Sequence, residues 1–315
     1  MTVLAEVVRS GLVESTHDGA IAAVTPEGAL VASLGDIDRV FFLRSAAKPF
    51  QATVSQELGA DLVPEQMAVA CASHRGHPVH VAIVGSMLTE VGLDEAALQC
   101  PPSWPSSAEA RDRVVAAGYQ HPKRVWHNCS GKHAAMLRAC VAQDWPIETY
   151  LDPGHPLQRR TFDMMAEVVG HDPGPVGIDG CGAPVFRGSV RSLARAYAVL
   201  GSQDRLAYAW DAMHRYPALT YDQGLAPSLI ATWLDAAAKV GAEGSLGVSI
   251  RGQMGLAVKS WDGSSRPTGA AMVALLDHLG FVGRDGGRAL ESVRVVPVMG
   301  GDRTVGSIVA REKWA

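Results

Sequence analysis

The sequence of 315 residues has no run of like charge and no long apolar stretch. Lysine and arginine number 28 and aspartate and glutamate 32, a net charge of −4, so no basic surface for nucleic acid is indicated. Glycine, proline or charge interrupts every apolar stretch before the roughly 18 residues that a membrane-spanning helix needs. Charged residues are few, at 19%, and apolar residues reach 47%, a composition that excludes intrinsic disorder.

Signals for export and for disulfides are also missing. The first ten residues lack a basic stretch followed by an apolar segment and a cleavage site, so we expect a cytoplasmic protein. The cysteines are odd in number and widely spaced, unlike a disulfide framework. We therefore expect reduced thiols at all five positions, Cys71, Cys100, Cys129, Cys140 and Cys181.

The pattern of apolar residues predicts strands at both ends of the chain and helices between them. We expect strands over 3–13, 20–24, 29–34, 245–250, 255–261, 293–298 and 305–310. Helical periodicity predicts helices over 49–58, 64–72, 78–91, 108–117, 133–143, 156–169, 190–200, 205–214, 228–240 and 270–279. This order favours an α+β fold in which the terminal strands share one antiparallel sheet. We expect one domain over 1–315, with a helical subdomain over about 60–240.

The first candidate for chemistry is a Ser-x-x-Lys pattern at the start of the helical region. Ser45 and Lys48 are three residues apart, so a helical turn puts them on the same face. A serine hydroxyl becomes a good nucleophile when a neighbouring base takes its proton, and an uncharged lysine amine is such a base. The pattern is also common by chance, and a helix-starting serine beside a solvated lysine is the alternative interpretation.

A second candidate combines thiols with other polar groups in two loops. Cys129 and Lys132 are three residues apart at a helix entrance, with His127 and His133 beside them. Asp179 and Cys181 lie in the glycine-rich segment 177–186, where glycine allows close approach of the backbone. Zinc is one interpretation, although no Cys-x-x-Cys signature is present. Buried structural thiols, or a cysteine nucleophile using either histidine, are the others.

Two further segments contribute single polar side chains. Ser73 lies in a segment with three histidines, which reads either as part of a site or as a polar loop between helices. Lys259 belongs to a strand pattern in which Leu256 and Val258 face one side and Ala257 and Lys259 the other. The lysine therefore points either into a cleft or into solvent. No glycine-rich phosphate-binding pattern accompanies a predicted strand, which argues against nucleotide chemistry.

Taken together, these segments resemble the asparaginase II family, the rhizobial-type, thermolabile L-asparaginases. The resemblance rests on Arg-Ser-Ala-Ala-Lys-Pro-Phe-Gln, Ala-Ser-His-x-Gly, His-Asn-Cys-Ser-Gly-Lys-His, Gly-Ile-Asp-Gly-Cys-Gly-x-Pro and Gly-Ala-Glu-Gly, the last followed by Gly-Leu-Ala-Val-Lys. It covers nearly the whole chain. It implies a fold similar to serine β-lactamases and penicillin-binding proteins, and hydrolysis of L-asparagine to L-aspartate and ammonia, usually by a homodimer.

The resemblance also implies roles for individual residues. The nucleophile would be Ser45 and its base Lys48, with a hydroxyl and amine relay completed by Ser73 and Lys259. One zinc ion, aiding substrate binding, would be held by Cys129, Lys132 and Cys181. Substrate recognition would fall to Asp179 at the ammonium group, and to Arg44 and His133 in the same pocket.

One segment departs from the family pattern. Residues 213–224 read Met-His-Arg-Tyr-Pro-Ala-Leu-Thr-Tyr-Asp-Gln-Gly where relatives usually have a His-Pro-x-x-Val-x-Gly type segment. This difference leaves substrate preference and turnover open. The alternatives to an asparaginase are a penicillin-interacting transpeptidase or β-lactamase, a cysteine amidase, and a zinc- or amino-acid-binding protein without turnover.

Overall fold

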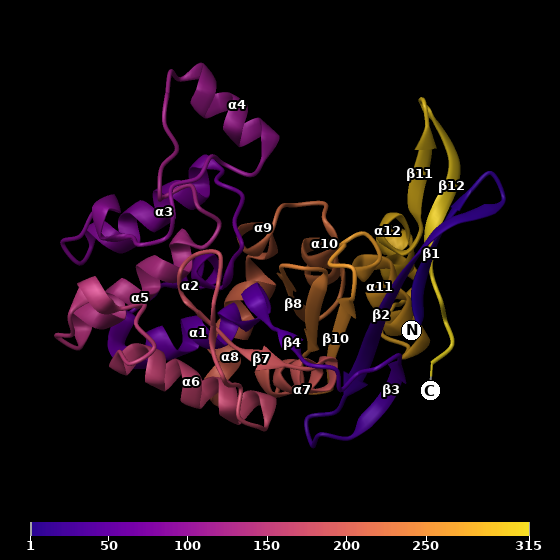
Figure 1. Cartoon of the computed structure of the whole chain (residues 1–315), viewed down its shortest axis with the longest axis horizontal. Helices are drawn as coiled ribbons and strands as arrows, with labels where there is room; N and C mark the ends of the chain where they lie inside the picture. The colour runs from indigo at the N-terminus through magenta and orange to yellow at the C-terminus, as the bar shows by residue number, and fades with distance from the viewer. Residues whose placement is uncertain (1, 315) are drawn as a thin grey trace.

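An eight-stranded antiparallel sheet runs through one side of the molecule and helices fill the other (Figure 1). The computed structural model describes residues 2–314. The sheet has the order β11-β12-β1-β2-β10-β9-β8, and β3 also pairs with β2. Its strands are β1 (Val3–Arg9), β2 (Leu12–Val24), β3 (Leu30–Leu34), β8 (Ala236–Gly241), β9 (Ser245–Ile250), β10 (Met254–Ser260), β11 (Val296–Gly300) and β12 (Arg303–Ala310). Two short ladders join β4 (Phe41–Phe42) to β7 (Arg187–Gly188) and β5 (Gly177–Ile178) to β6 (Pro184–Val185).

Most helices lie between β4 and β8 in the chain. They are α1 (Lys48–Ser55), α2 (Pro64–Cys71), α3 (Pro78–Thr89), α4 (Ala108–Ala116), α5 (Ser130–Ala142), α6 (Pro156–Val169), α7 (Val190–Leu200), α8 (Asp204–Arg215), α9 (Pro217–Thr220), α10 (Ala226–Trp233), α11 (Thr268–His278) and α12 (Arg284–Arg294). Several begin at proline, which lacks the N–H that a first turn leaves unpaired. Short helical turns cover η1 (Arg44–Ala47), η2 (Gln56–Ala60), η3 (Glu95–Ala97) and η4 (Ile147–Thr149). Among residues 2–314, no helix has the length and apolar character needed to cross a membrane.

The two faces of the sheet have different cores because side chains alternate along each strand. On β10, Leu256 and Val258 belong to the core that includes α11. Ala257 belongs to the larger core under α7, which crosses β10, β2 and β9. Small residues on this second face let the helices approach the sheet closely. The functional side chains described below lie between this face and the helices.

The structure confirms the α+β prediction and differs from it in three details. The strands expected over 3–13 and 20–24 are divided differently, because β2 runs without a break from Leu12 to Val24 and the chain turns earlier, at Ser10 and Gly11. The helix expected over 228–240 ends at Trp233, and 236–241 form β8. Helix α12 was not expected. The alanines at 236–238 favour a helix locally, but pairing with β9 and burial override that preference.

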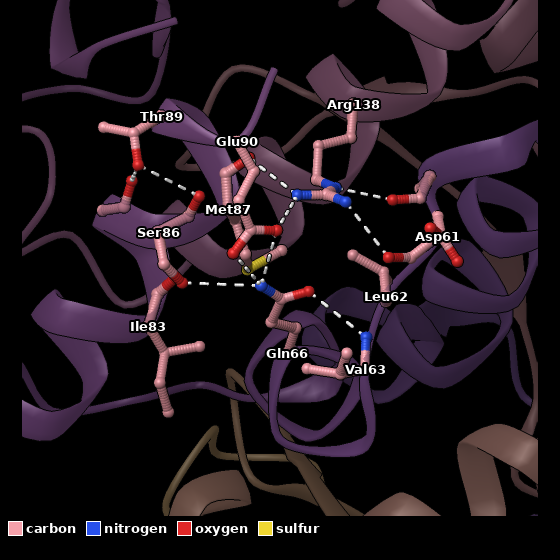
Figure 2. Close-up of polar contacts among 12 residues, drawn as sticks. Asp61, Leu62, Val63, Gln66, Ile83, Ser86, Met87, Thr89, Glu90 and Arg138 are labelled. Atoms are coloured by element: carbon pink, nitrogen blue, oxygen red, sulfur yellow. Dashed lines mark hydrogen bonds and ion pairs between the residues drawn. The ribbon is translucent and has the colours of Figure 1, made fainter. Parts of the chain in front are cut away.

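Helix α5 is anchored to its neighbours by Arg138 (Figure 2). The Arg138 guanidinium donates to the carboxylate of Glu90 at 2.6 Å and to the carbonyl of Asp61 at 3.0 Å. Gln66 donates to the same carboxylate at 3.0 Å, so α2, α3 and α5 meet at one point. This contact fixes the helix whose first turn carries Lys132 and His133.

Candidate active site

The turn that carries Ser45 is strained. Arg44, directly before it, has φ of +52°, a left-handed conformation that costs a non-glycine residue roughly 1–2 kcal/mol. Two contacts hold it: Leu43 N–H donates to Phe186 O at 2.9 Å, and Arg44 Nε donates to Asp179 Oδ1 at 2.7 Å. Such strain persists where surrounding structure fixes it, and it often lies at functional sites. Here it precedes a serine that lines a cavity.

The cavity has a volume of about 370 Å³ and is lined by polar groups from both layers of the molecule. Two predicted catalytic residues, Ser45 and Ser73, are part of its lining. The other lining residues are Arg75, Ser106, Asn128, Tyr221, Val240, Gly241, Ala242, Glu243, Gly244, Ser245, Gly263 and Ser265. A space of this size suits a small substrate.

Lys48 is buried beside this cavity, with only 1% of its surface exposed. Its Nζ lies 2.6 Å from Ala72 O, 3.2 Å from Asn128 O and 3.2 Å from Ser73 Oγ. Lys48 is joined to Ser45 through its backbone, whose N–H donates to Ser45 O, but within residues 2–314 no hydrogen bond joins the Lys48 amine to the Ser45 hydroxyl. The structure therefore brings Lys48 to Ser73 and leaves the Ser45 hydroxyl in the cavity wall.

A second buried lysine, Lys239 on β8, also contacts Ser73. Its Nζ is 2.7 Å from Ser73 Oγ and 2.8 Å from Val240 O, and its side chain is 1% exposed. Burial, together with the charge of nearby Lys48, holds the pKa of Lys239 well below its usual range. The Ser73 hydroxyl thus lies between two lysine amines, one of which favours its uncharged form.

The contact with the Ser73 hydroxyl that was expected of Lys259 is therefore made by Lys239. Lys259 Nζ instead donates to the carbonyls of Glu243 and Ser260, and it lies over the Trp261 ring at 5.5 Å. Both lysines face the same side of the sheet, as alternation predicts. However, β9 separates β10 from β8, and strands lie about 4.8 Å apart, so Lys259 starts about 10 Å from the edge strand.

The three side chains expected to bind zinc come together. Lys132 Nζ lies 3.3 Å from Cys181 Sγ, and the Cys129 thiol, which donates to Asn128 Oδ1 at 3.3 Å, is near enough to Cys181 for each to shift the pKa of the other. The Cys129 thiol and Lys132 lower the pKa of Cys181 against the effect of burial, while the pKa of Cys129 is raised. Burial alone would lower the pKa of Lys132, but the two sulfurs outweigh it and raise that pKa.

This donor set fits a zinc ion only if the lysine amine takes part. Across residues 2–314, no three His, Cys, Asp or Glu side chains gather closely enough to hold a metal. Two sulfurs and an amine that has lost its proton are compatible with zinc. The buried Nε2 of His133, without a hydrogen-bond partner in the described chain, adds a nitrogen beside Lys132.

The residues expected to recognise substrate do not line the cavity. Asp179 is paired with Arg44 and also accepts from Gly180 N–H at 2.7 Å. His133 is fully buried, and its Nδ1 lies 2.6 Å from the Tyr150 hydroxyl. Burial lowers the pKa of His133. Arg44 and Asp179 thus support the strained turn, and His133 belongs with the cysteine cluster.

Comparison with known proteins identifies the family. The sequence pattern of L-asparaginase II matches residues 5–310. The chain belongs to the L-asparaginase II family. This finding agrees with the resemblance of the motifs, and it supports an amidohydrolase acting on a small amide. A comparison with curated proteins gives no match.

A solved structure shares the fold of this L-asparaginase II family member. The crystal structure of Mglu in its glutamate form is 18% identical with a TM-score of 0.50, covering 88% of this chain. The chain spans 65% of the length of Mglu. A Bacillus glutaminase crystallised in 4.3 M NaCl is 12% identical with a TM-score of 0.47, and the match covers 84% of this chain and 91% of that one. The fold is α+β and similar to serine β-lactamases, as expected.

Lys239 is the residue that sequence reasoning missed in this L-asparaginase II chain. The signal for it is Lys239-Val240-Gly241, a variant of the Lys-Thr-Gly that accompanies Ser-x-x-Lys in β-lactamases. The helix expected over 228–240 concealed it. The glycine is required because a Cβ at Gly241 would lie 2.9 Å from Leu43 O and 3.3 Å from Ala46 N. Strand β8 therefore passes directly against the turn of Ser45.

Proposed function

We propose that the chain hydrolyses the side-chain amide of L-asparagine to L-aspartate and ammonia through an acyl-enzyme on Ser45. The observation that carries the proposal is the buried sequence of contacts Lys48–Ser73–Lys239 beside a cavity that Ser45 lines. Family membership supports the reaction class.

In this proposal the two buried amines share one proton. Lys48 Nζ donates to Ala72 O and Asn128 O, and Lys239 Nζ contacts the same Ser73 hydroxyl as Lys48. When the proton moves from Lys48 to Lys239 through Ser73, the lone pair of Lys48 becomes available to the Ser45 hydroxyl. Ser45 Oγ attacks the amide carbon while its proton passes to Lys48, and the C–N bond breaks as ammonia leaves with that proton. Ser73 and Lys239 carry protons between these steps.

Water completes the cycle. It attacks the aspartyl ester on Ser45, gives its proton to the same amines, and Ser45 recovers its proton as aspartate leaves. The negative oxygen formed in each step needs donors, and we assign the backbone N–H groups of Ser45 and of Ala242, which directly follows β8; both residues line the cavity. A donor of this kind contributes about 3–4 kcal/mol.

A zinc ion belongs to the proposal as a substrate-binding group. Cys129, Lys132 and Cys181 would hold it, and it would supply positive charge beside the cavity. Metal analysis of the purified protein tests this assignment: about one zinc per chain is expected, falling towards zero in Cys181→Ser. A Cys181→Ser protein that keeps its full zinc content would contradict it.

The rival interpretations have less support. Cys129 is 4% exposed and is absent from the cavity lining, which disfavours it as a nucleophile. A β-lactamase would open a chromogenic cephalosporin, and a pure binding protein would hold asparagine without releasing ammonia. A homodimer and a cytoplasmic location remain proposals, to be checked by analytical ultracentrifugation and by cell fractionation.

An ammonia-release assay with asparagine and glutamine tests the function. Wild type should release ammonia faster from asparagine, and Ser45→Ala should lose at least about 10³-fold in kcat. Ser33→Ala, in β3 and outside the cavity lining, is the matched control and should behave as wild type. Absence of ammonia release by wild type, or near-native turnover by Ser45→Ala, would overturn the proposal.

A further inference from the structure

Glu243 occupies a turn where its residue type is unfavourable. The three residues 242–244 connect β8 to β9, and both Glu243 and Gly244 have left-handed backbones, with φ of +62° and +69°. Glycine or asparagine fits such a position better, and a glutamate there costs roughly 1 kcal/mol or more. A side chain kept at this cost points to a function.

The surroundings hold this turn in place from two sides. Lys259 Nζ donates to the backbone carbonyl of Glu243. On the other side, a Cβ at Gly263 would lie only 2.6 Å from Glu243 Oε2, so the carboxylate packs against a position that needs glycine. Lys259 is therefore a positioning residue for Glu243, which accounts for a lysine that takes no part in the Ser73 relay.

Glu243 lines the cavity that contains Ser45, and its side chain is exposed. Among residues 2–314, no group donates a hydrogen bond to it. Asp179, by contrast, is already engaged by Arg44 at 2.7 Å and by Gly180 N–H at 2.7 Å. The cationic side chain in the lining, Arg75, pairs with Asp222 at 3.2 Å. Glu243 is thus the lining carboxylate with capacity for a cation.

The spacing suits an amino-acid amide. Gly241 packs against the Ser45 turn, and Glu243 follows two residues later, so its backbone lies at most about 7 Å farther along the chain. In asparagine the amide carbon and the α-nitrogen are separated by three bonds, so one substrate molecule reaches both Ser45 and Glu243.

We propose that the Glu243 carboxylate binds the α-ammonium group of the substrate, with Lys259 fixing the turn that presents it. This assignment rests on the proposed function for the identity of the substrate as an amino-acid amide. It makes the cavity selective for α-amino acids over acids that lack the amino group, and it replaces Asp179 in that role.

Isothermal calorimetry with L-aspartate and with succinate tests whether Glu243 binds the α-ammonium group. The two ligands differ by the amino group, and neither is hydrolysed. Wild type should prefer aspartate by about tenfold or more. Glu243→Gln should lose most of that preference, by weakening aspartate binding while succinate binding stays the same or improves. Glu27→Gln, an exposed turn residue, is the matched control and should keep the preference.

Three results would overturn the inference: wild type without a preference for aspartate, Glu243→Gln with the preference intact, or equal losses for both ligands. Loss of the preference in Asp179→Asn but not in Glu243→Gln would return the role to Asp179. Lys259→Met should reduce the preference and raise the KM for asparagine more than it lowers kcat. Because binding is measured without hydrolysis, a wild type that prefers aspartate yet releases no ammonia would defeat the proposed function alone.

Discussion

At the scale of the residue, Lys239 on β8 and Lys259 on β10 have separate roles. Lys239→Met removes an amine 2.7 Å from Ser73, and we expect kcat for ammonia release to fall by about 10²–10⁴. Lys259→Met leaves the relay intact, so its kcat should fall by less than about tenfold. Steady-state kinetics on both variants checks this, and a larger kcat loss in Lys259→Met than in Lys239→Met would contradict it.

His80 predicts how stability changes with pH. Burial lowers the pKa of His80 to about 4, with His77 adding to the effect and Asp222 opposing it. In the unfolded chain His80 takes up a proton near pH 6.5, whereas in the folded chain it does so only near pH 4. Protonation therefore favours the unfolded chain, and the free energy of unfolding decreases as the pH falls from about 6.5 to about 4. The loss is about 3 kcal/mol for a shift of this size.

Denaturant unfolding between pH 7 and pH 4 measures that loss, and His80→Gln should reduce it. His214→Gln, at a half-exposed histidine, is the control. Buried His74, which stacks on His80 at 5.2 Å between ring centroids and whose pKa burial also lowers, leaves a residual dependence in both variants. An unchanged pH dependence in His80→Gln would show the assignment to be wrong.

At the scale of the element, Arg138 determines how firmly α5 is held. Arg138→Met removes one of the two donors to the Glu90 carboxylate and the side-chain donor to three backbone carbonyls, which should cost roughly 2–4 kcal/mol of unfolding free energy. Arg113→Met breaks an exposed pair with Glu109 and should cost under about 0.5 kcal/mol. Urea denaturation of the two variants compares them, and equal costs would contradict the role given to Arg138.

Elements were predictable from sequence where local signals agreed with the fold. Helices α6 and α7 begin and end where periodicity places them, because proline or serine marks their starts. Strand β8 was not predictable from sequence, because its alanines favour a helix and only its pairing with β9 makes it a strand. The error had a consequence for chemistry, because it hid Lys239 within an expected helix and left Lys259 as the nearest candidate.

At the scale of the whole molecule, the sequence predicts the α+β class and the gathering of the terminal strands into one sheet. The motifs of the sequence also identify Ser45 and Ser73, which line one cavity, and the group of Cys129, Lys132 and Cys181. The order of strands across the sheet lay beyond prediction, because pairing of distant segments leaves no local signal. The division of the chain into a single domain stays a prediction.

Strand β1 pairs with β12, so that Ala5 lies opposite Ala310 (Figure 1). During synthesis on the ribosome, the edge of β1 that pairs with β12 therefore stays unpaired until β12, near the end of the chain, has been translated. At 5–20 residues per second, translation of the intervening 300 or so residues takes roughly 15–60 s. During that time the unpaired edge of β1 can pair with other nascent chains. In a circularly permuted gene that begins after the β1–β2 hairpin, a different strand edge would stay unpaired during translation.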